Sequence, residues 1–300
     1  MKGYKYKNPR LPQEGVCGGE KPKAKLILEW PVPSDRRKAV WPAFLMPHAN
    51  SNSNASVPAS PVQPRYHALV PCAGSGSRAG TDQPKQYQSI AGQPLVMHTL
   101  WALAGVARLT AGLVVLSPGD DFVWPEAEAW PERFARKHCG GASRAHSVFN
   151  GLQALRESGA RDSDWVLVHD AARCLVTPAL VNTLIDACIN DPVGGLLALP
   201  LPDTLKRAAA GRVAATVPRE DKWLAQTPQM VRLGALQDAL AAQAATGFAG
   251  VTDEASALEM AGLQPLLVPG SAHNFKVTYP ADFALAQAVL VNRIAKEKTP

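Results

Sequence analysis

The sequence predicts an α/β fold, a mostly parallel twisted sheet flanked by helices, with a protruding β-arm. Two observations indicate this fold. From residue 65 onward, short apolar runs of strand length alternate with apolar spacings typical of helices. The alternation lapses between Asp203 and Thr227, where two short β-prone runs flank a turn at Gly211. Alternation of this kind is typical of a parallel sheet covered by helices, and the lapse predicts a projecting hairpin.

The elements are expected in the following order. Strands are predicted at 68–70, 113–116, 165–168, 196–199, 266–268 and 275–277, with the hairpin strands at 204–207 and 213–217. Helices are predicted from Pro94 (with Val96, Leu100, Leu103 and Ala107 on one face), around 148–155, 180–188, 233–245 and 253–261, and finally around Leu285 and Val289. Residues 120–137 show no clear period, and their aromatic side chains are expected in the core or a lid.

Residues 1–64 differ in composition from the rest. They hold seven Lys and three Arg against three Glu and one Asp, and therefore the whole net charge of +6. The remainder has 21 basic and 21 acidic residues, so nucleic-acid binding loses its main support. Ten of the 26 prolines also lie there, which favours a disordered or poorly packed leader. A secretory signal is disfavoured because no continuous apolar stretch is present, and an upstream start codon is an alternative origin.

The cysteine pattern and the hydropathy of the sequence indicate the cellular compartment of the protein. The five cysteines are scattered and form no C-x-x-C pair, which favours a reducing cytoplasm over a disulfide framework. No run approaches the ~20 apolar residues of a membrane span. We therefore expect a cytoplasmic protein with neither a membrane nor a nucleic acid as partner.

A glycine-rich loop follows the first predicted strand, in A-L-V-P-C-A-G-S-G-S-R-A-G-T-D-Q-P-K-Q-Y (68–87). Glycines let backbone N–H groups approach an anion, and Arg78 and Lys85 add the charge that a polyphosphate requires. The spacing misses G-x-G-x-x-G by one residue and lacks the P-loop pattern. The loop suits a nucleoside triphosphate attacked at its α-phosphate.

Two further motifs carry candidate chemistry. H-D-A-A-R (169–173) follows a predicted strand, at the end where ligands of α/β sheets bind. Its carboxylate, Asp170, suits a hard ion such as Mg²⁺, although capping of a turn is an equal alternative. G-G-A-S-R-A-H-S-V (140–148) is typical of a helix cap, and its backbone groups also suit the edge of a pyrimidine.

Together these motifs resemble the nucleotidyltransferases, and most of all the 2-C-methyl-D-erythritol 4-phosphate cytidylyltransferase family. The resemblance extends over residues 65–290. It implies a Rossmann-like nucleotidyltransferase fold for a domain at 65–296, with an arm at about 203–226 that is exchanged within a homodimer. It also implies CTP and a sugar-alcohol phosphate as substrates in isoprenoid precursor biosynthesis, and Mg²⁺ or another hard divalent cation as cofactor.

The resemblance assigns roles to individual residues. The catalytic residues would be Arg78, Lys85, Arg219 and Lys276. The nucleotide would contact Ala73, Gly74, Ser75, Gly76, Gly141, Ala142, Ser147 and Asp170, and Asp170 would also bind the metal. The acceptor would contact Arg173, Thr204, Arg219, Thr227, Thr252 and Lys276. Ala142 departs from the acidic residue of many relatives, so any base recognition at this position falls to the backbone.

Two alternatives stay open. A cytidylyltransferase for another polyol phosphate, such as ribitol 5-phosphate, would need few altered contacts. A non-catalytic nucleotide-binding or nucleic-acid-binding module would use the basic leader, and would show salt-dependent affinity.

Overall fold

The computed structural model describes residues 63–74, 83–122, 124 and 130–297. The predicted leader (1–64) lies almost wholly outside these residues. So do Ser75, Gly76 and Arg78 of the first loop. The described residues fall within one compact unit, residues 59–300. No helix among them has the length and apolar character of a bilayer span.

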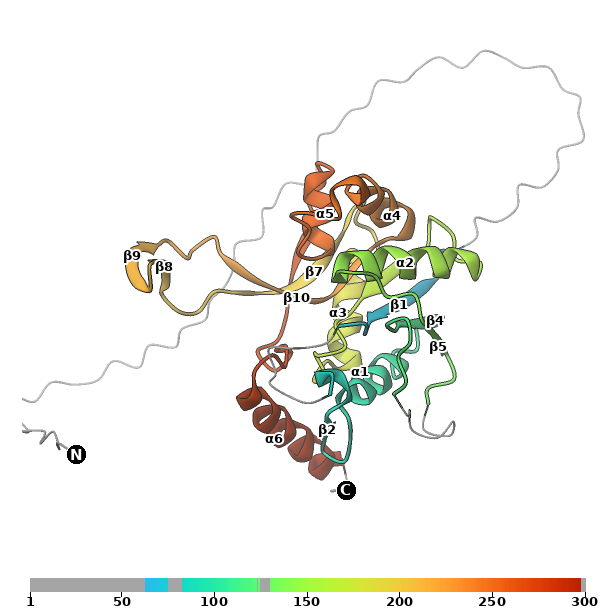
Figure 1. The fold of residues 1–300 in the computed structure, drawn as a ribbon, viewed down its shortest axis with the longest axis horizontal. Coiled ribbons are helices and arrows are strands. Elements are labelled where there is room, and N and C mark those ends of the chain that lie inside the picture. Colours follow the sequence, from blue (N-terminus) through green and yellow to red (C-terminus); the bar gives the residue numbers. More distant parts are fainter. Residues whose placement is uncertain (1–62, 75–82, 123, 125–129, 298–300) are drawn as a thin grey trace, which may run out of the picture. The chain divides into compact units, whose positions relative to one another are not determined.

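A seven-stranded sheet forms the centre of this unit, in the order β11-β7-β10-β6-β1-β4-β5 (Figure 1). Its strands are β1 (Tyr66–Pro71), β4 (Ala111–Val115), β5 (Phe134–Lys137), β6 (Trp165–Val168), β7 (Gly194–Pro200), β10 (Trp223–Arg232) and β11 (Leu266–Pro269). Strand β1 is parallel to both β4 and β6, β4 is parallel to β5, and β7 is parallel to β11. Only β10 is antiparallel to its neighbours, which confirms the predicted mostly parallel sheet.

Helices cover both faces of the sheet. Helices α1 (Leu95–Ala104) and α3 (Pro178–Cys188) contribute to one hydrophobic cluster. Helices α2 (Arg144–Glu157), α4 (Leu233–Ala241) and α5 (Glu254–Met260) contribute to the other. In Figure 1, α1 and α2 accordingly lie on opposite sides of β1. Each fully buried Leu or Val at these helical spacings stabilises the fold by about 1.5–3 kcal/mol.

A third, smaller cluster lies beside the sheet. Helix α6 (Pro280–Glu297) packs Ala286 and Leu290 against Ile90 and Val277. The remaining short elements are the 3₁₀ turns Lys85–Tyr87 and Ala244–Thr246 and the strands β2 (Ser89–Ile90) and β3 (Gln93–Pro94). This packing holds Val277, the residue that follows Lys276, against helix α6.

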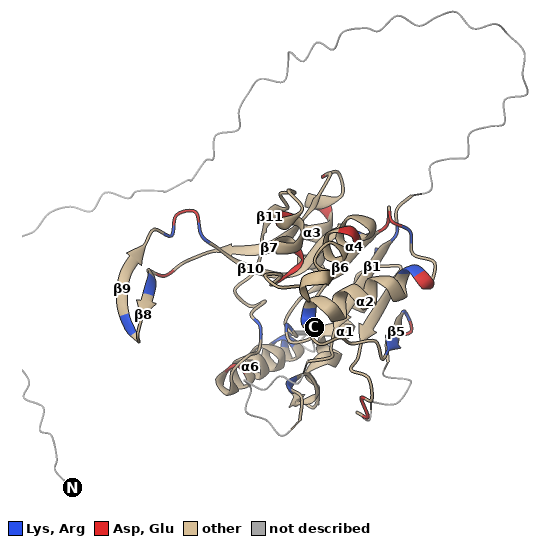
Figure 2. Cartoon of the chain, turned by 45° about the horizontal axis from the view of Figure 1, so that its top comes forward, with Lys and Arg blue, Asp and Glu red and all other residues tan. Residues whose placement is uncertain are grey.

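The arm is a hairpin of β8 (Leu205–Ala209) and β9 (Arg212–Val217) that projects from the body (Figure 1). Ala210 and Gly211 form its turn with φ of 47° and 74°, a conformation that favours glycine. Both strands carry basic residues (Figure 2), and Val213 is 67% exposed. The predicted hairpin is therefore confirmed.

Several element predictions were wrong. The central strand β10 was missed because its sequence, W-L-A-Q-T-P-Q-M-V-R, contains a proline and polar residues. The strand register shifts between Ala225 and Gln229, so the proline falls in an irregularity of the ladder. Residues 275–277 form no strand. A hydrogen bond from Val277 N to the carbonyl oxygen of Ala172 connects this segment to the loop after β6. Helix α1 ends before Ala107.

The unassigned stretch 120–137 holds the edge strand β5. Phe134 is buried in the core, and the partly buried Trp124 and Trp130 pack against this core. Of the two expected locations, core or lid, these aromatic residues therefore occupy the core and its edge. The sequence did not show the strand because only its first residue is buried.

Candidate active site

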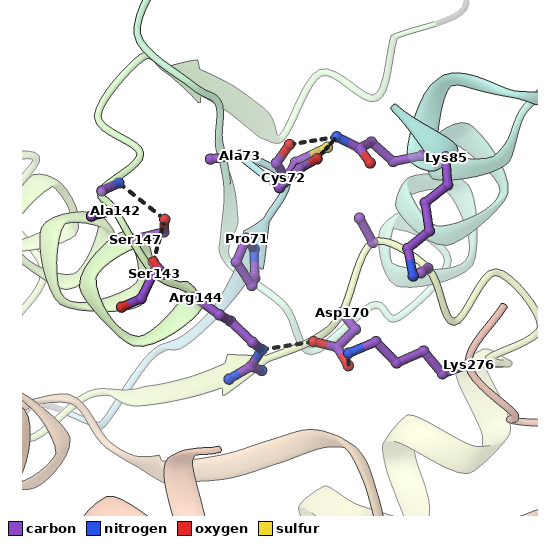
Figure 3. Close-up of a pocket in the computed structure, with 15 residues that line it drawn as sticks. Pro71, Cys72, Ala73, Lys85, Ala142, Ser143, Arg144, Ser147, Asp170 and Lys276 are labelled. Atoms are coloured by element: carbon purple, nitrogen blue, oxygen red, sulfur yellow. Dashed lines mark hydrogen bonds and ion pairs between the residues drawn. The ribbon is translucent and has the colours of Figure 1, made fainter. Parts of the chain in front are cut away.

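The site lies where strands β1 and β6 end, which is the ligand-binding edge of an α/β sheet. A cavity of about 540 Å³ opens there between the loop after β1, the start of α2 and the loop after β6 (Figure 3). Its lining includes the predicted residues Ala73, Gly74, Lys85, Gly141, Ala142, Ser147, Asp170 and Lys276. The structure therefore brings together all the described residues that were predicted to bind the nucleotide.

Residues 72–74, at the start of the loop after β1, are held by the side chains of Gln86 and Ser117. The Gln86 amide donates to the carbonyl oxygens of Cys72 and Gly74, at 3.0 and 2.8 Å. The Ser117 hydroxyl donates to the carbonyl of Ala73 at 2.7 Å. The carbonyl groups of residues 72–74 are thereby fixed, so this described part of the loop is preorganised before any ligand arrives.

The Gly-Gly turn packs too closely for side chains. A Cβ atom on Gly140 would lie 2.3 Å from Cβ of Ala73, and one on Gly141 would lie 2.3 Å from Cγ of His146. Ser147 Oγ accepts from Gly141 N at 3.0 Å and donates to Ser143 O at 2.9 Å. Ser147 thus ties the turn to the start of α2, and the glycines allow it to approach the first loop.

Asp170 is the electrostatic centre of the cavity, and Arg144 and Lys276 approach it from opposite sides (Figure 3). Arg144 Nε lies 2.9 Å from Oδ1, Lys276 Nζ lies 2.9 Å from Oδ2, and Arg173 Nε lies 3.7 Å from Oδ2. Burial alone would raise the pKa of Asp170, but the three cations hold this pKa well below its usual range. The carboxylate is therefore ionised at neutral pH.

Arg144 has a second carboxylate partner. Its Nη1 and Nη2 atoms lie 2.7 and 3.2 Å from the two carboxylate oxygens of Glu254, at the start of α5. The Glu254 side chain is buried, and this burial raises its pKa although Arg144 opposes the shift. Burial alone would lower the pKa of Arg144, yet the two carboxylates raise it.

A smaller cavity of about 210 Å³ adjoins the first one. The predicted acceptor-binding residues Arg173, Thr227, Thr252 and Lys276 line it. Arg144, Asp170 and Lys276 line both cavities. A ligand in either cavity therefore meets the same three charged side chains.

Two of the acceptor-side residues are bonded within the protein. The Thr227 hydroxyl accepts from Asp170 N at 3.0 Å and lies 3.1 Å from His169 Nδ1. Burial lowers the pKa of His169 to about 4, so the ring is neutral. Its Nε2 lies 3.2 Å from the Arg173 carbonyl oxygen, which can only accept, so Nε2 carries the proton and Nδ1 accepts from the Thr227 hydroxyl. The Arg173 guanidinium donates to the carbonyls of Asn274 and Ala225, at 2.8 and 3.2 Å.

The predicted arm residues lie elsewhere. Thr204 and Arg219 are exposed and line neither cavity of their own chain, and Arg219 bonds the Pro202 carbonyl. In the described part of the chain, no group of three or more His, Cys, Asp or Glu side chains is arranged to hold a metal.

Three residues of the site were missed from the sequence: Gln86, Arg144 and Glu254. One signal was available for Arg144. It is the first residue of α2, where the helix dipole disfavours a cation. A carboxylate partner or an anionic ligand was therefore to be expected. Glu254 gave no such signal because an acidic residue suits the first turn of any helix.

The fold and the site define a class of protein. Two adjoining cavities and a cluster of cations around one carboxylate suit the transfer of a group between two phosphate-bearing ligands, which depends on positioning and on neutralisation of charge. The protein is a nucleotidyltransferase with an α/β fold.

Comparison with known proteins identifies the family. The profile of the 2-C-methyl-D-erythritol 4-phosphate cytidylyltransferases matches residues 66–292. The chain is 53% identical over 231 residues to the enzyme of that name from Burkholderia multivorans, covering 76% of this chain and 97% of the relative. It is 58% identical over 250 residues to a bifunctional IspD/IspF enzyme from Albidiferax ferrireducens, covering 83% of this chain but only 59% of that relative.

Solved structures agree with this match. A crystal structure of a 4-diphosphocytidyl-2C-methyl-D-erythritol synthase has a TM-score of 0.66 and 38% identity, covering 76% of this chain and all of that one. The Francisella tularensis cytidylyltransferase has a TM-score of 0.65 and 31% identity, covering 75% of this chain and 99% of that one. The chain belongs to the 2-C-methyl-D-erythritol 4-phosphate cytidylyltransferase family.

Proposed function

We propose that the chain transfers CMP from CTP to 2-C-methyl-D-erythritol 4-phosphate, and releases pyrophosphate, in isoprenoid precursor biosynthesis. Membership of the family supports this reaction. The observation that carries it for this chain is the pair of adjoining cavities that share Arg144, Asp170 and Lys276. One cavity has the size and charge for a nucleoside triphosphate, and the other suits a small phosphorylated acceptor.

In this proposal CTP occupies the larger cavity. The backbone of Ala73, Gly74, Ser75 and Gly76 binds its phosphates. Gly141 and Ala142 bind the base through their backbone. Ser147 keeps the Gly-Gly turn in place, since its hydroxyl accepts from Gly141 N and donates to the carbonyl of Ser143, the residue before helix α2.

The reaction is an in-line displacement at the α-phosphorus. A phosphate oxygen of the acceptor forms the new P–O bond, and the bond to pyrophosphate breaks on the opposite side. The attacking oxygen belongs to an ionised phosphate, so no general base and no covalent enzyme intermediate are required. Lys85 and Arg78 stabilise the negative charge that develops on the α-phosphate, and positioning supplies most of the remainder.

The acceptor binds in the smaller cavity. Lys276 and Arg173 supply positive charge there, and Thr252 supplies a hydroxyl. Thr227 orients Asp170 from behind. Arg219 and Thr204 reach the acceptor from the arm of a second subunit, so the active form is a homodimer. Residues 65–296 make up the catalytic domain, and 1–64 are a separate leader.

Asp170 is also the residue that would hold Mg²⁺. Mg²⁺ in nucleotide sites is commonly bound by one or two carboxylates together with phosphate oxygens, and the ionised Asp170 carboxylate on the cavity wall belongs to that donor set. When bound, the ion would neutralise charge on the triphosphate. A cytoplasmic location is favoured because the described cysteines are all free thiols.

The test is a screen of acceptors. The full chain is incubated with CTP, Mg²⁺ and one of several sugar-alcohol phosphates, and pyrophosphate release is measured. Release with 2-C-methyl-D-erythritol 4-phosphate well above that with ribitol 5-phosphate is expected. A preference for ribitol 5-phosphate would replace the proposed acceptor. Absence of release with every acceptor, together with salt-sensitive binding of nucleic acid, would overturn the enzymatic proposal.

A further inference from the structure

Glu254 is a buried acidic residue that the proposed reaction does not use. It is 2% exposed and lines neither cavity. Both of its carboxylate oxygens face the Arg144 guanidinium, at 2.7 and 3.2 Å. Burial of a carboxylate is costly unless it is paired, so its place next to the active site calls for an explanation.

Arg144 is shared between two carboxylates. Its Nε donates to Asp170 at 2.9 Å, and its two terminal nitrogens donate to Glu254. Helix α2 holds the arginine in this place, and helix α5 holds Glu254, whose neighbour Asp253 caps that helix through Ser256. Both residues of the ion pair are therefore held by helices.

The sharing affects the charge that Asp170 experiences. Three cations, Arg144, Lys276 and Arg173, lie within 2.9 to 3.7 Å of its carboxylate. With Asp170 and Glu254 both ionised, the five groups sum to one positive charge. Without the Glu254 charge they would sum to two, and Arg144 would interact with Asp170 alone. A divalent cation would then meet stronger repulsion and a more firmly occupied carboxylate.

We propose that Glu254 is a positioning residue which, by binding Arg144, keeps Asp170 available to the divalent cation that accompanies the nucleotide. This inference rests on the proposed role of Asp170 as the metal-binding residue. It assigns no contact between Glu254 and either substrate. Removal of a residue bonded to a metal ligand commonly changes metal affinity or activity by about 10- to 100-fold, and Glu254, which acts through Arg144, belongs at the lower end of that range.

Glu254→Gln tests the inference, since it keeps the shape of the side chain and removes its charge. CTP binding to the full chain is measured by calorimetry in EDTA and at a series of Mg²⁺ concentrations. CTP affinity is expected to increase with Mg²⁺, and the Mg²⁺ concentration at half of this increase is the quantity compared. We expect this concentration to be about tenfold higher in Glu254→Gln than in the wild type. CTP affinity in EDTA should stay equal or become tighter, because the cavity gains positive charge.

Glu259→Gln is the matched control, because Glu259 lies exposed on the same helix. It should leave the Mg²⁺ requirement unchanged. Where Glu254→Gln fails to fold, as judged by circular dichroism, Glu254→Asp replaces it. This variant keeps the charge but shortens the side chain, and a rise of about threefold is expected from the longer ion pair.

The outcomes distinguish failure of the positioning role of Glu254 from failure of the proposed metal-binding role of Asp170. An unchanged Mg²⁺ requirement in the folded Glu254 variant would overturn the inference and leave the pair a purely structural one. CTP binding by the wild type that ignores Mg²⁺ would overturn the metal-binding role of Asp170, and this inference with it. Failure of the acceptor screen alone would affect neither result, because no acceptor is present in the binding experiment.

Discussion

Lys85 Nζ donates a hydrogen bond of 2.9 Å to the carbonyl oxygen of Val277, the residue that follows Lys276. The lysine of the first loop therefore contacts the segment that carries the second lysine of the site. Lys85 and Lys276 both line the larger cavity. We expect a bound triphosphate to draw the Lys85 ammonium group toward its phosphates, since a charged acceptor makes a stronger hydrogen bond than a neutral carbonyl.

The first prediction concerns this lysine. Lys85→Ala should lower kcat about 10²- to 10³-fold, the usual cost of losing one donor that stabilises transition-state charge. Pyrophosphate release measures the rate, and circular dichroism checks the fold. Lys137→Ala is the control, because Lys137 is an exposed lysine on β5 outside both cavities. Arg78→Ala should act in the same direction as Lys85→Ala, and near-normal turnover in either variant would remove its assignment.

Lys276→Ala should chiefly raise the KM for the acceptor. The ammonium group lines both cavities and lies 2.9 Å from Asp170, so its loss removes positive charge where the acceptor phosphate would bind. A rise of about 10-fold or more is expected, in line with the loss of a charged hydrogen bond. Initial rates at varied acceptor concentration measure it, with the exposed Lys296→Ala on α6 as control. An unchanged KM in both Lys276→Ala and Arg219→Ala would discredit the acceptor pocket.

Much of the larger cavity could be predicted from the sequence because of a general property of parallel sheets. Gly74 follows β1 and Asp170 follows β6, and these neighbouring parallel strands bring their carboxyl ends together. Local motifs were therefore enough to place the two residues in one site. The roles of individual residues came from the resemblance to a family and stay predictions.

The parts that could not be predicted depend on contacts between distant segments. Arg144 and Glu254 lie 110 residues apart in the chain, and no local pattern pairs them. Strand β10 carries Gln226 and Thr227 in place of the apolar residues of a central strand. Their side chains bond Ser271 and the backbone of Asp170, so this stretch departs from strand propensity where it serves the site.

Thr227→Val should destabilise the fold and lower activity together. The substitution keeps the shape but leaves the buried amide of Asp170 and the ring of His169 without their hydroxyl partner. An unsatisfied buried group costs about 1–3 kcal/mol, which urea unfolding would detect. Thr227→Ser keeps the hydroxyl and should restore most of kcat/KM. Equal stability of Thr227→Val and the wild type would show that the Thr227 hydroxyl bonds to Asp170 and His169 do not stabilise the fold.

Asp164, the residue before strand β6, lies at the edge of the sheet opposite the cavities, and its carboxylate should make the stability of the fold depend on pH. The fully buried Asp164 carboxylate accepts hydrogen bonds from Arg65, Arg161 and His67. Burial alone would raise the pKa of Asp164, but these hydrogen bonds hold it below its unfolded value of 3.8. Its contribution to stability is therefore complete above about pH 5 and is lost as the pH falls through the folded pKa.

The corresponding variant is Asp164→Asn. Near pH 7 it should lower the free energy of unfolding by about 2–4 kcal/mol, because buried donors lose a charged acceptor. The difference from the wild type should shrink as urea unfolding is repeated toward pH 3. Asp162→Asn is the control, since its side chain is 61% exposed and its pair with Arg156 is worth about 0–1 kcal/mol. A difference that stays constant with pH would contradict the ionised state of Asp164.

The last prediction tests whether the arm serves a second subunit. Arg219 lines neither cavity of its own chain, so in the proposed dimer it acts on the partner. Lys85→Ala and Arg219→Ala subunits are co-expressed with different tags and purified through both, so that every dimer is a hybrid. One of its two sites then has an intact Lys85 and receives an intact Arg219, and roughly half of wild-type activity should return. Rates are compared at an acceptor concentration well below the wild-type KM, where the raised KM of Arg219→Ala and Lys276→Ala appears as a lower rate. A hybrid of Lys85→Ala with Lys276→Ala should then stay far less active than the first hybrid, because each change impairs its own chain's site. Equal activity of the two hybrids, or a protein that cannot be purified through both tags, would overturn the exchange of arms.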